Sequence, residues 1–136
     1  MSNKLEIQIT QEGPRNAIVK LTGIIDTSDI VESPAISLVD CLNNDVNLTL
    51  AGFRVDLIEW SMSAGMEIQL AWNGTIPQQI FPLAGRGRIN STNYGGFIPD
   101  TTRPGYDGSI NLYSNGYAAG TVQNFTIILE LIKLYQ

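Results

Sequence analysis

Apolar and polar side chains alternate along much of this chain, which is the pattern of half-buried β-strands. The alternation starts with Leu5, Ile7 and Ile9, which are separated by polar residues, and it is most regular between residues 66 and 72. Turn-forming residues divide these stretches from one another. The predicted strands are residues 5–9, 17–25, 46–50, 53–62, 66–72, 75–81, 109–114 and 122–135.

The last of these stretches is apolar on both faces. One face carries Phe125, Ile127, Leu129 and Leu131, and the other is made partly apolar by Ile128 and Ile132. A strand of this kind is typical of a sandwich interior or of a subunit interface.

The turns carry further predictions. Asn73-Gly74 is the preferred two-residue hairpin turn. Gly23 indicates a bulge within its strand, and Pro77 places the strand at 75–81 at an edge or a bulge. Residues 84–108 are rich in glycine and have few strand signals, so we expect a long functional loop there.

A short helix is predicted after Ser33-Pro34, because proline suits the first helical position. Ile36, Val39 and Leu42 then fall at a spacing of three on one face. Helices and strands do not alternate along the chain, which excludes an α/β fold. The pattern therefore predicts an all-β fold: an antiparallel, jelly-roll-like β-sandwich formed by one domain over residues 1–136, with at most one short helix.

The composition narrows the class of partner. The chain has 136 residues, of which 43% are hydrophobic and only 15% charged, so we expect part of its surface to be covered by another chain. The formal net charge is −5 and the basic residues are scattered, which argues against nucleic acid as a partner. No apolar run approaches the ~20 residues that cross a bilayer, and the N-terminus has no apolar signal region. We expect synthesis in a reducing cytoplasm and no membrane contact.

The residues needed for most enzyme chemistry are missing. The chain has no histidine, which removes the commonest general base and metal ligand. Its one cysteine, Cys41, lies in an apolar stretch where a lone thiol is usually inert. We therefore expect no catalytic residues, no cofactor and no metal.

Two carboxylate pairs offer alternatives to the absence of catalytic and metal-binding residues. Glu59 and Glu67 flank one turn and could serve a small glycosidase, but ordinary solvent-facing strand positions explain them better. Asp26 and Asp29 offer fewer oxygens than calcium requires, so capping of turns is the better interpretation.

The candidate partner-binding residues lie in the long loop, where arginines stand near aromatic residues. Arginine and tyrosine are enriched at protein interfaces, but the same chemistry also suits sugar binding, and the sequence does not separate the two. Arg86 and Arg88 could instead brace the loop against Asp100 or Asp107. The candidates are Arg86, Arg88, Tyr94, Phe97, Arg103 and Tyr106.

A series of short segments, taken in order, resembles the small virion structural proteins of tailed bacteriophages that decorate or cement a capsid. The segments cover nearly the whole chain. They are EGPRN at 12–16, GIIDTSD at 23–29, GFRVD at 52–56, LAW at 70–72, LAGRG at 83–87, GG at 95–96, GYAAG at 116–120 and LELIK at 129–133.

The resemblance implies a non-enzymatic decoration or cement protein on the capsid surface that binds the major capsid protein and stabilises the head. Such proteins are β-rich and often trimeric, and the two apolar faces of residues 122–135 also suggest a homotrimer. The alternative is a carbohydrate- or receptor-binding module of a phage tail or fibre, with Trp60, Trp72 or the loop tyrosines as sugar platforms.

Overall fold

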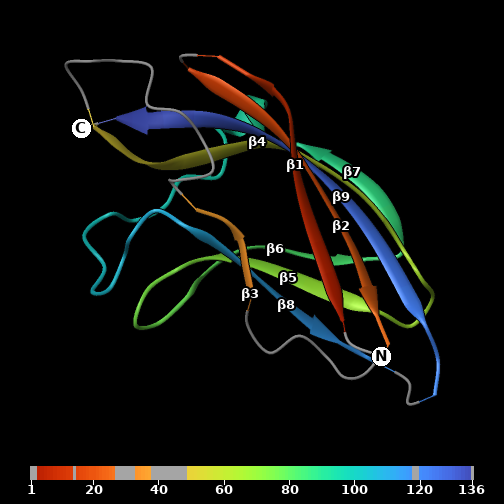
Figure 1. The fold of residues 1–136 in the computed structure, drawn as a ribbon. Helices are drawn as coiled ribbons and strands as arrows, with labels where there is room; N and C mark the ends of the chain where they lie inside the picture. Colours follow the sequence, from red (N-terminus) through yellow and green to blue (C-terminus); the bar gives the residue numbers. More distant parts are fainter. Residues whose placement is uncertain (1–2, 14, 27–32, 38–48, 118–119, 136) are drawn as a thin grey trace.

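Two antiparallel sheets pack face to face in the computed structural model, which describes residues 3–13, 15–26, 33–37, 49–117 and 120–135 (Figure 1). The five-stranded sheet has the order β1 (Lys4–Glu12), β2 (Asn16–Ile25), β9 (Gln123–Tyr135), β4 (Leu50–Met62) and β7 (Arg86–Asn90). The four-stranded sheet has the order β3 (Ser33–Ile36), β8 (Ile110–Asn115), β5 (Glu67–Trp72) and β6 (Gln78–Ala84). The prediction of an all-β, jelly-roll-like sandwich is confirmed.

The core lies between the sheets and is apolar. Alternate residues of each strand point into it, as in the series Phe125, Ile127, Leu129 and Leu131 on β9, all of which are buried. Burial of one such side chain contributes about 1.5–3 kcal/mol. The opposite face of β9 carries the half-buried Ile128 and Ile132, as the sequence pattern predicts.

The helix predicted after Ser33 is wrong for the residues that the structure describes. Residues Ser33–Ile36 form β3, which pairs with β8 through Ser33 and Leu112 and through Ile36 and Ile110. Ala35 and Ile36 are both fully buried, so burial against β8 overrides the helical spacing. β3 is an edge strand, where a proline is tolerated. Val39, Cys41 and Leu42 lie outside the described residues, as do the first three residues of the strand predicted at 46–50.

The two-residue hairpin at Asn73-Gly74 is also wrong. β5 and β6 are joined by residues 73–77, and no described residue other than glycine has a positive φ, so Asn73 does not adopt the geometry of that turn. Asn73 instead bonds to the neighbouring loop: its backbone N–H donates to the Ser109 carbonyl (2.9 Å) and its Nδ2 donates to Asp107 (2.9 Å). The expectation of an edge strand after Pro77 is confirmed, because β6 is the last strand of its sheet.

The long loop expected at 84–108 is shorter than predicted, because residues Arg86–Asn90 form the edge strand β7 against β4. Because of Gly87, the sequence of this strand resembles that of a turn. The glycine's lack of a side chain has a packing reason, since a Cβ there would lie 2.5 Å from Cζ2 of Trp60.

Gly23 does not mark a bulge, since the register is continuous through it on both sides of β2. A Cβ at Gly23 would overlap the ring of Phe125, its cross-strand partner, so close packing explains this glycine.

Candidate functional site

The six candidate residues fall in two different places. Arg86 and Arg88 are exposed on β7. The other four lie in residues 91–109, hereafter the edge segment, which follows β7 and leads to β8; they are Tyr94, Phe97, Arg103 and Tyr106.

Hydrogen bonds attach the edge segment to both sheets. Phe97 exchanges backbone bonds with Val55 on β4 (2.9 and 2.8 Å). The side-chain amide of Gln78 on β6 bonds both the N–H (2.8 Å) and the carbonyl (3.0 Å) of Asp100. The edge segment therefore bridges the five-stranded and four-stranded sheets, and its backbone is more constrained than that of a free loop.

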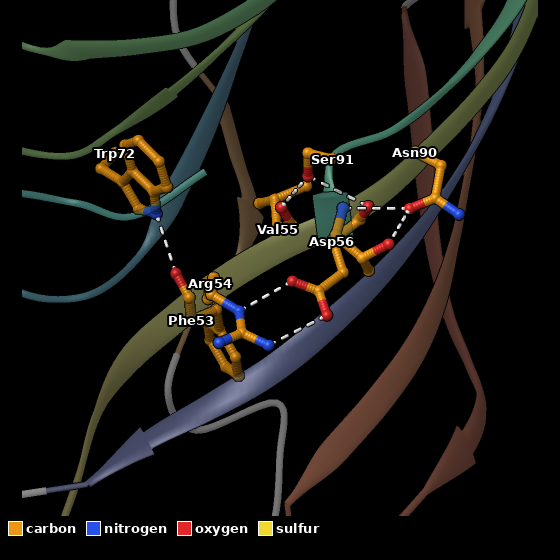
Figure 2. A network of polar contacts seen from close by, with 8 residues as sticks. Phe53, Arg54, Val55, Asp56, Trp72, Asn90 and Ser91 are labelled. Carbon is orange, nitrogen blue, oxygen red and sulfur yellow. Dashed lines mark hydrogen bonds and ion pairs between the residues drawn. The ribbon is translucent and has the colours of Figure 1, made fainter. Parts of the chain in front are cut away.

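A polar network fixes the start of the segment to β4 (Figure 2). Arg54 donates to both carboxylate oxygens of Asp56 (2.8 and 3.1 Å), and this hydrogen bonding raises the pKa of Arg54. The Ser91 hydroxyl donates to the Val55 carbonyl (2.8 Å), and Ser91 is completely buried. Gly96 has φ +80°, and a Cβ there would lie 2.6 Å from both Arg54 Cδ and Asp56 Oδ1. The backbone therefore passes directly over the ion pair.

The aromatic residues of the segment divide into inward and outward ones. Phe97 stacks on Phe81 of β6, with ring centroids 5.8 Å apart. Tyr106 is half-buried and donates to the Ala51 carbonyl (3.1 Å), and burial raises the pKa of its hydroxyl. Tyr94 is 78% exposed. Of the aromatic candidates, Tyr94 is thus the one placed to contact a partner.

Bracing of the segment by Arg86 and Arg88 is not observed. Neither guanidinium has a hydrogen bond or ion pair within the described part of the chain. Asp100 instead accepts from Thr102, which lowers the pKa of its carboxyl, and lies 3.6 Å from Arg103.

Asp107 also bonds to residues other than the two arginines. Burial acts to raise the pKa of its carboxyl, but hydrogen bonds from Ser109 and Asn73 outweigh that effect and the pKa lies below its ordinary value. Both carboxylates proposed to brace the arginines therefore stabilise turns.

A second surface, which the sequence did not reveal, lies on the solvent-facing side of the five-stranded sheet. Thr22 on β2 is directly opposite Thr126 on β9, which is directly opposite Ser61 on β4. The row continues to Glu6 on β1 and to Arg86 on β7. Directly opposed residues share a face, so these five side chains cross the whole sheet in one line.

Hollows follow this line. One of about 320 Å³ is lined by Glu59, Ser61, Arg86, Thr126 and Ile128 among others. A second of about 230 Å³ extends over β1 and β2, and a third of about 320 Å³ lies at the ends of β4 and β9. All three include Thr126, so they meet at the middle of the row and form one shallow depression, hereafter the cross-strand groove.

The structure adds no support for the glycosidase and calcium alternatives. Glu59 lies on β4 of one sheet and Glu67 on β5 of the other, both exposed. Within the described ranges no group of three or more histidine, cysteine, aspartate or glutamate residues is placed to hold a metal ion. Asp29 lies outside those ranges.

The two tryptophans do not serve as open sugar platforms. Trp72 is buried and its indole N–H donates to the Phe53 carbonyl (3.2 Å; Figure 2). Trp60 is half-buried and donates to the Ala84 carbonyl (2.9 Å).

In the part of the chain that the structure describes, no helix is long and apolar enough to span a membrane.

Comparison of the sequence with protein-family models and with curated proteins finds no match. Two solved structures are similar in fold. A cupin superfamily protein from Desulfitobacterium hafniense DCB-2 is 10% identical with a TM-score of 0.39, covering 98% of this chain and 81% of the other. A CBM4 structure is 6% identical with a TM-score of 0.29, covering 97% and 93%. These similarities concern the fold alone.

Proposed function

We propose that this protein is a non-enzymatic structural protein of a tailed-bacteriophage virion, which decorates the capsid surface and binds the major capsid protein. The sequence resemblance motivates the proposal. The observation that carries it is the edge segment, a recognition element that is held to both sheets and still presents large apolar side chains to solvent.

The exposed side chains suit a protein partner. Tyr94 is 78% exposed and Ile98 is 61% exposed in the segment, and Ile76 is 68% exposed in the adjoining connection between β5 and β6. That connection is tied to the segment by the bond from Thr75 N–H to the Pro104 carbonyl (2.9 Å). Exposed aromatic and aliphatic side chains can fill pockets on a partner. The fixed backbone that carries them lowers the entropic cost of association.

Replacing Tyr94 and Ile98 together by alanine should weaken capsid binding by about 1–3 kcal/mol per residue, the usual cost of truncating an interface hot spot. Both side chains point to solvent, so the melting temperature should stay within about 2 °C of wild type. Occupancy is measured by titrating purified protein onto capsids that lack it. Val122→Ala is the control, since Val122 is 56% exposed outside the segment. Undiminished occupancy of the double variant would contradict the proposed contact.

A homotrimer remains part of the proposal. Ile18 and Ile132 are half-buried on the outer face of the five-stranded sheet, and another subunit would bury them further. Light scattering at micromolar concentration should give three times the monomer mass, and a stable monomer would contradict this assignment.

The second candidate function is carbohydrate binding, which was the alternative from the sequence. The two tryptophans are not open platforms, whereas Tyr94, one of the loop tyrosines, is 78% exposed, and the cross-strand groove gives this function a further basis.

A further inference from the structure

The shape of the cross-strand groove follows from side-chain lengths in neighbouring rows. Its floor consists of the short hydroxyl side chains of Thr22, Thr126 and Ser61 on the three central strands. Short side chains flanked by longer ones leave a trough that runs across the strands.

The walls are longer residues. One wall lies two residues away from the row of Thr22, Thr126, Ser61 and Arg86 on each strand. It comprises Lys20, Ile128, Glu59 and Arg88, which are directly opposed across β2, β9, β4 and β7. On the other side of the floor stand Lys4, Ile24 and Asn124. The solvated face of an antiparallel sheet is generally polar, with no set order of side-chain length. Here three hydroxyl residues are adjacent across three strands, and longer residues stand on both sides of them.

The polar groups of the groove are available to a ligand. Within the described part of the chain, the side chains of Thr22, Ser61, Glu59, Arg86 and Thr126 have no hydrogen bond or ion pair. Glu59 and Arg88 are directly opposed, yet they form no ion pair within 4 Å. These groups therefore remain free to donate to and accept from a bound molecule.

The three floor side chains are uncharged, whereas the walls and ends of the groove carry charges of both signs. The cationic residues are Lys4, Lys20, Arg86 and Arg88, and the anionic ones are Glu6 and Glu59. A polyanion such as nucleic acid would meet both carboxylates. An extended peptide generally binds through main-chain hydrogen bonds to the edge strand of a sheet. The floor of this groove offers side-chain hydroxyls instead, so it does not suit a peptide.

The length of the groove indicates an extended ligand. It crosses five strands, and four inter-strand spacings of roughly 4.8 Å give about 19 Å. We propose that the cross-strand groove binds a neutral, extended oligosaccharide, whose hydroxyl groups bond to Thr22, Thr126 and Ser61 and to the flanking carboxylate and guanidinium groups. This site is separate from the edge segment, so the inference does not depend on capsid binding.

The test uses the full-length protein on an array of neutral and acidic oligosaccharides, followed by calorimetric titration with the neutral tetrasaccharide that gives the highest signal. The variant Thr126→Val with Ser61→Ala removes two floor hydroxyls at nearly constant shape and should lower affinity at least tenfold. Thr101→Val, an exposed threonine of the edge segment, is the matched control and should leave affinity unchanged. Melting temperatures of all variants establish that they are folded.

A second variant, Glu59→Ala, removes a carboxylate that lines the groove and should weaken sugar binding several-fold while capsid occupancy stays unchanged. The Tyr94 and Ile98 double variant should show the reverse, so failure of one proposal is distinguishable from failure of the other. The groove proposal is overturned if no neutral oligosaccharide on the array binds, if only acidic ones bind, or if Thr126→Val with Ser61→Ala binds as tightly as wild type.

Discussion

Replacing Glu12 by alanine should lower the free energy of unfolding by about 3 kcal/mol, because it removes the carboxylate from a buried ion pair. Lys133 Nζ lies 2.7 Å from Glu12 Oε2, and the lysine side chain is completely buried whereas that of Glu12 is 17% exposed. The pair joins the end of β1 to the end of β9, which are separated by β2 in the sheet. Chemical denaturation should show the loss directly, and thermal denaturation should show a fall in melting temperature of about 10 °C.

A double variant separates the loss of the ion pair from the cost of leaving one buried charge in place. Lys133→Met with Glu12→Gln removes both charges, so it should be clearly more stable than Glu12→Ala, which takes the Glu12 carboxylate away from a buried ammonium group. Glu67→Ala on β5 is the control for loss of an exposed strand glutamate, and should change stability by less than about 0.5 kcal/mol. A Glu12→Ala variant as stable as this control would show that the pair contributes nothing.

Strands with regular alternation could be predicted from sequence because one buried face dictates their pattern. β5 and β9 are the clearest cases, since their inward residues, such as Leu70 and Ile127, are fully buried as the period of two requires. The same local information failed at Ser33, where burial of Ala35 and Ile36 against β8 decides the conformation. It failed again at Asn73, whose hydrogen bonds go to residues more than 30 positions away.

The cross-strand groove depends on information that no local pattern contains. Thr22, Ser61 and Thr126 are far apart in the sequence and become neighbours only through the register of three strands. Each is unremarkable by itself as a polar residue on an exposed face. Knowledge of strand order and register is therefore necessary to recognise the row, and a shift of one residue in either pairing would abolish it.

The prediction of a relaxed loop at residues 84–108 does not describe the edge segment, which hydrogen bonds hold to both sheets. Its glycines suggested relaxed backbone geometry, yet Gly96 is required because the chain passes close over Arg54 and Asp56. Rigidity suits the proposed role better, because a segment held in its binding conformation loses little entropy on docking. The two proposals thus concern separate surfaces, one at an edge of the sandwich for a protein partner and one across a sheet for a sugar chain.

Neighbouring glycines in this segment allow the effect of packing to be separated from the effect of backbone conformation. Gly95 and Gly96 have nearly equal φ values of +84° and +80°, which L-residues rarely adopt. A Cβ at Gly95 would meet nothing within 4 Å, whereas one at Gly96 would lie 2.6 Å from atoms of Arg54 and Asp56. Gly95→Ala should therefore cost about 1 kcal/mol, the conformational penalty alone.

Gly96→Ala should cost about 3 kcal/mol, because overlap with the ion pair adds to the same conformational penalty. Urea denaturation of the two variants measures the difference. Displacement of the backbone at Gly96 should also move Tyr94 and Ile98, so capsid occupancy should fall for Gly96→Ala and much less for Gly95→Ala. Equal destabilisation by the two substitutions would mean that Arg54 and Asp56 yield without cost, and that the polar network does not fix the edge segment in place.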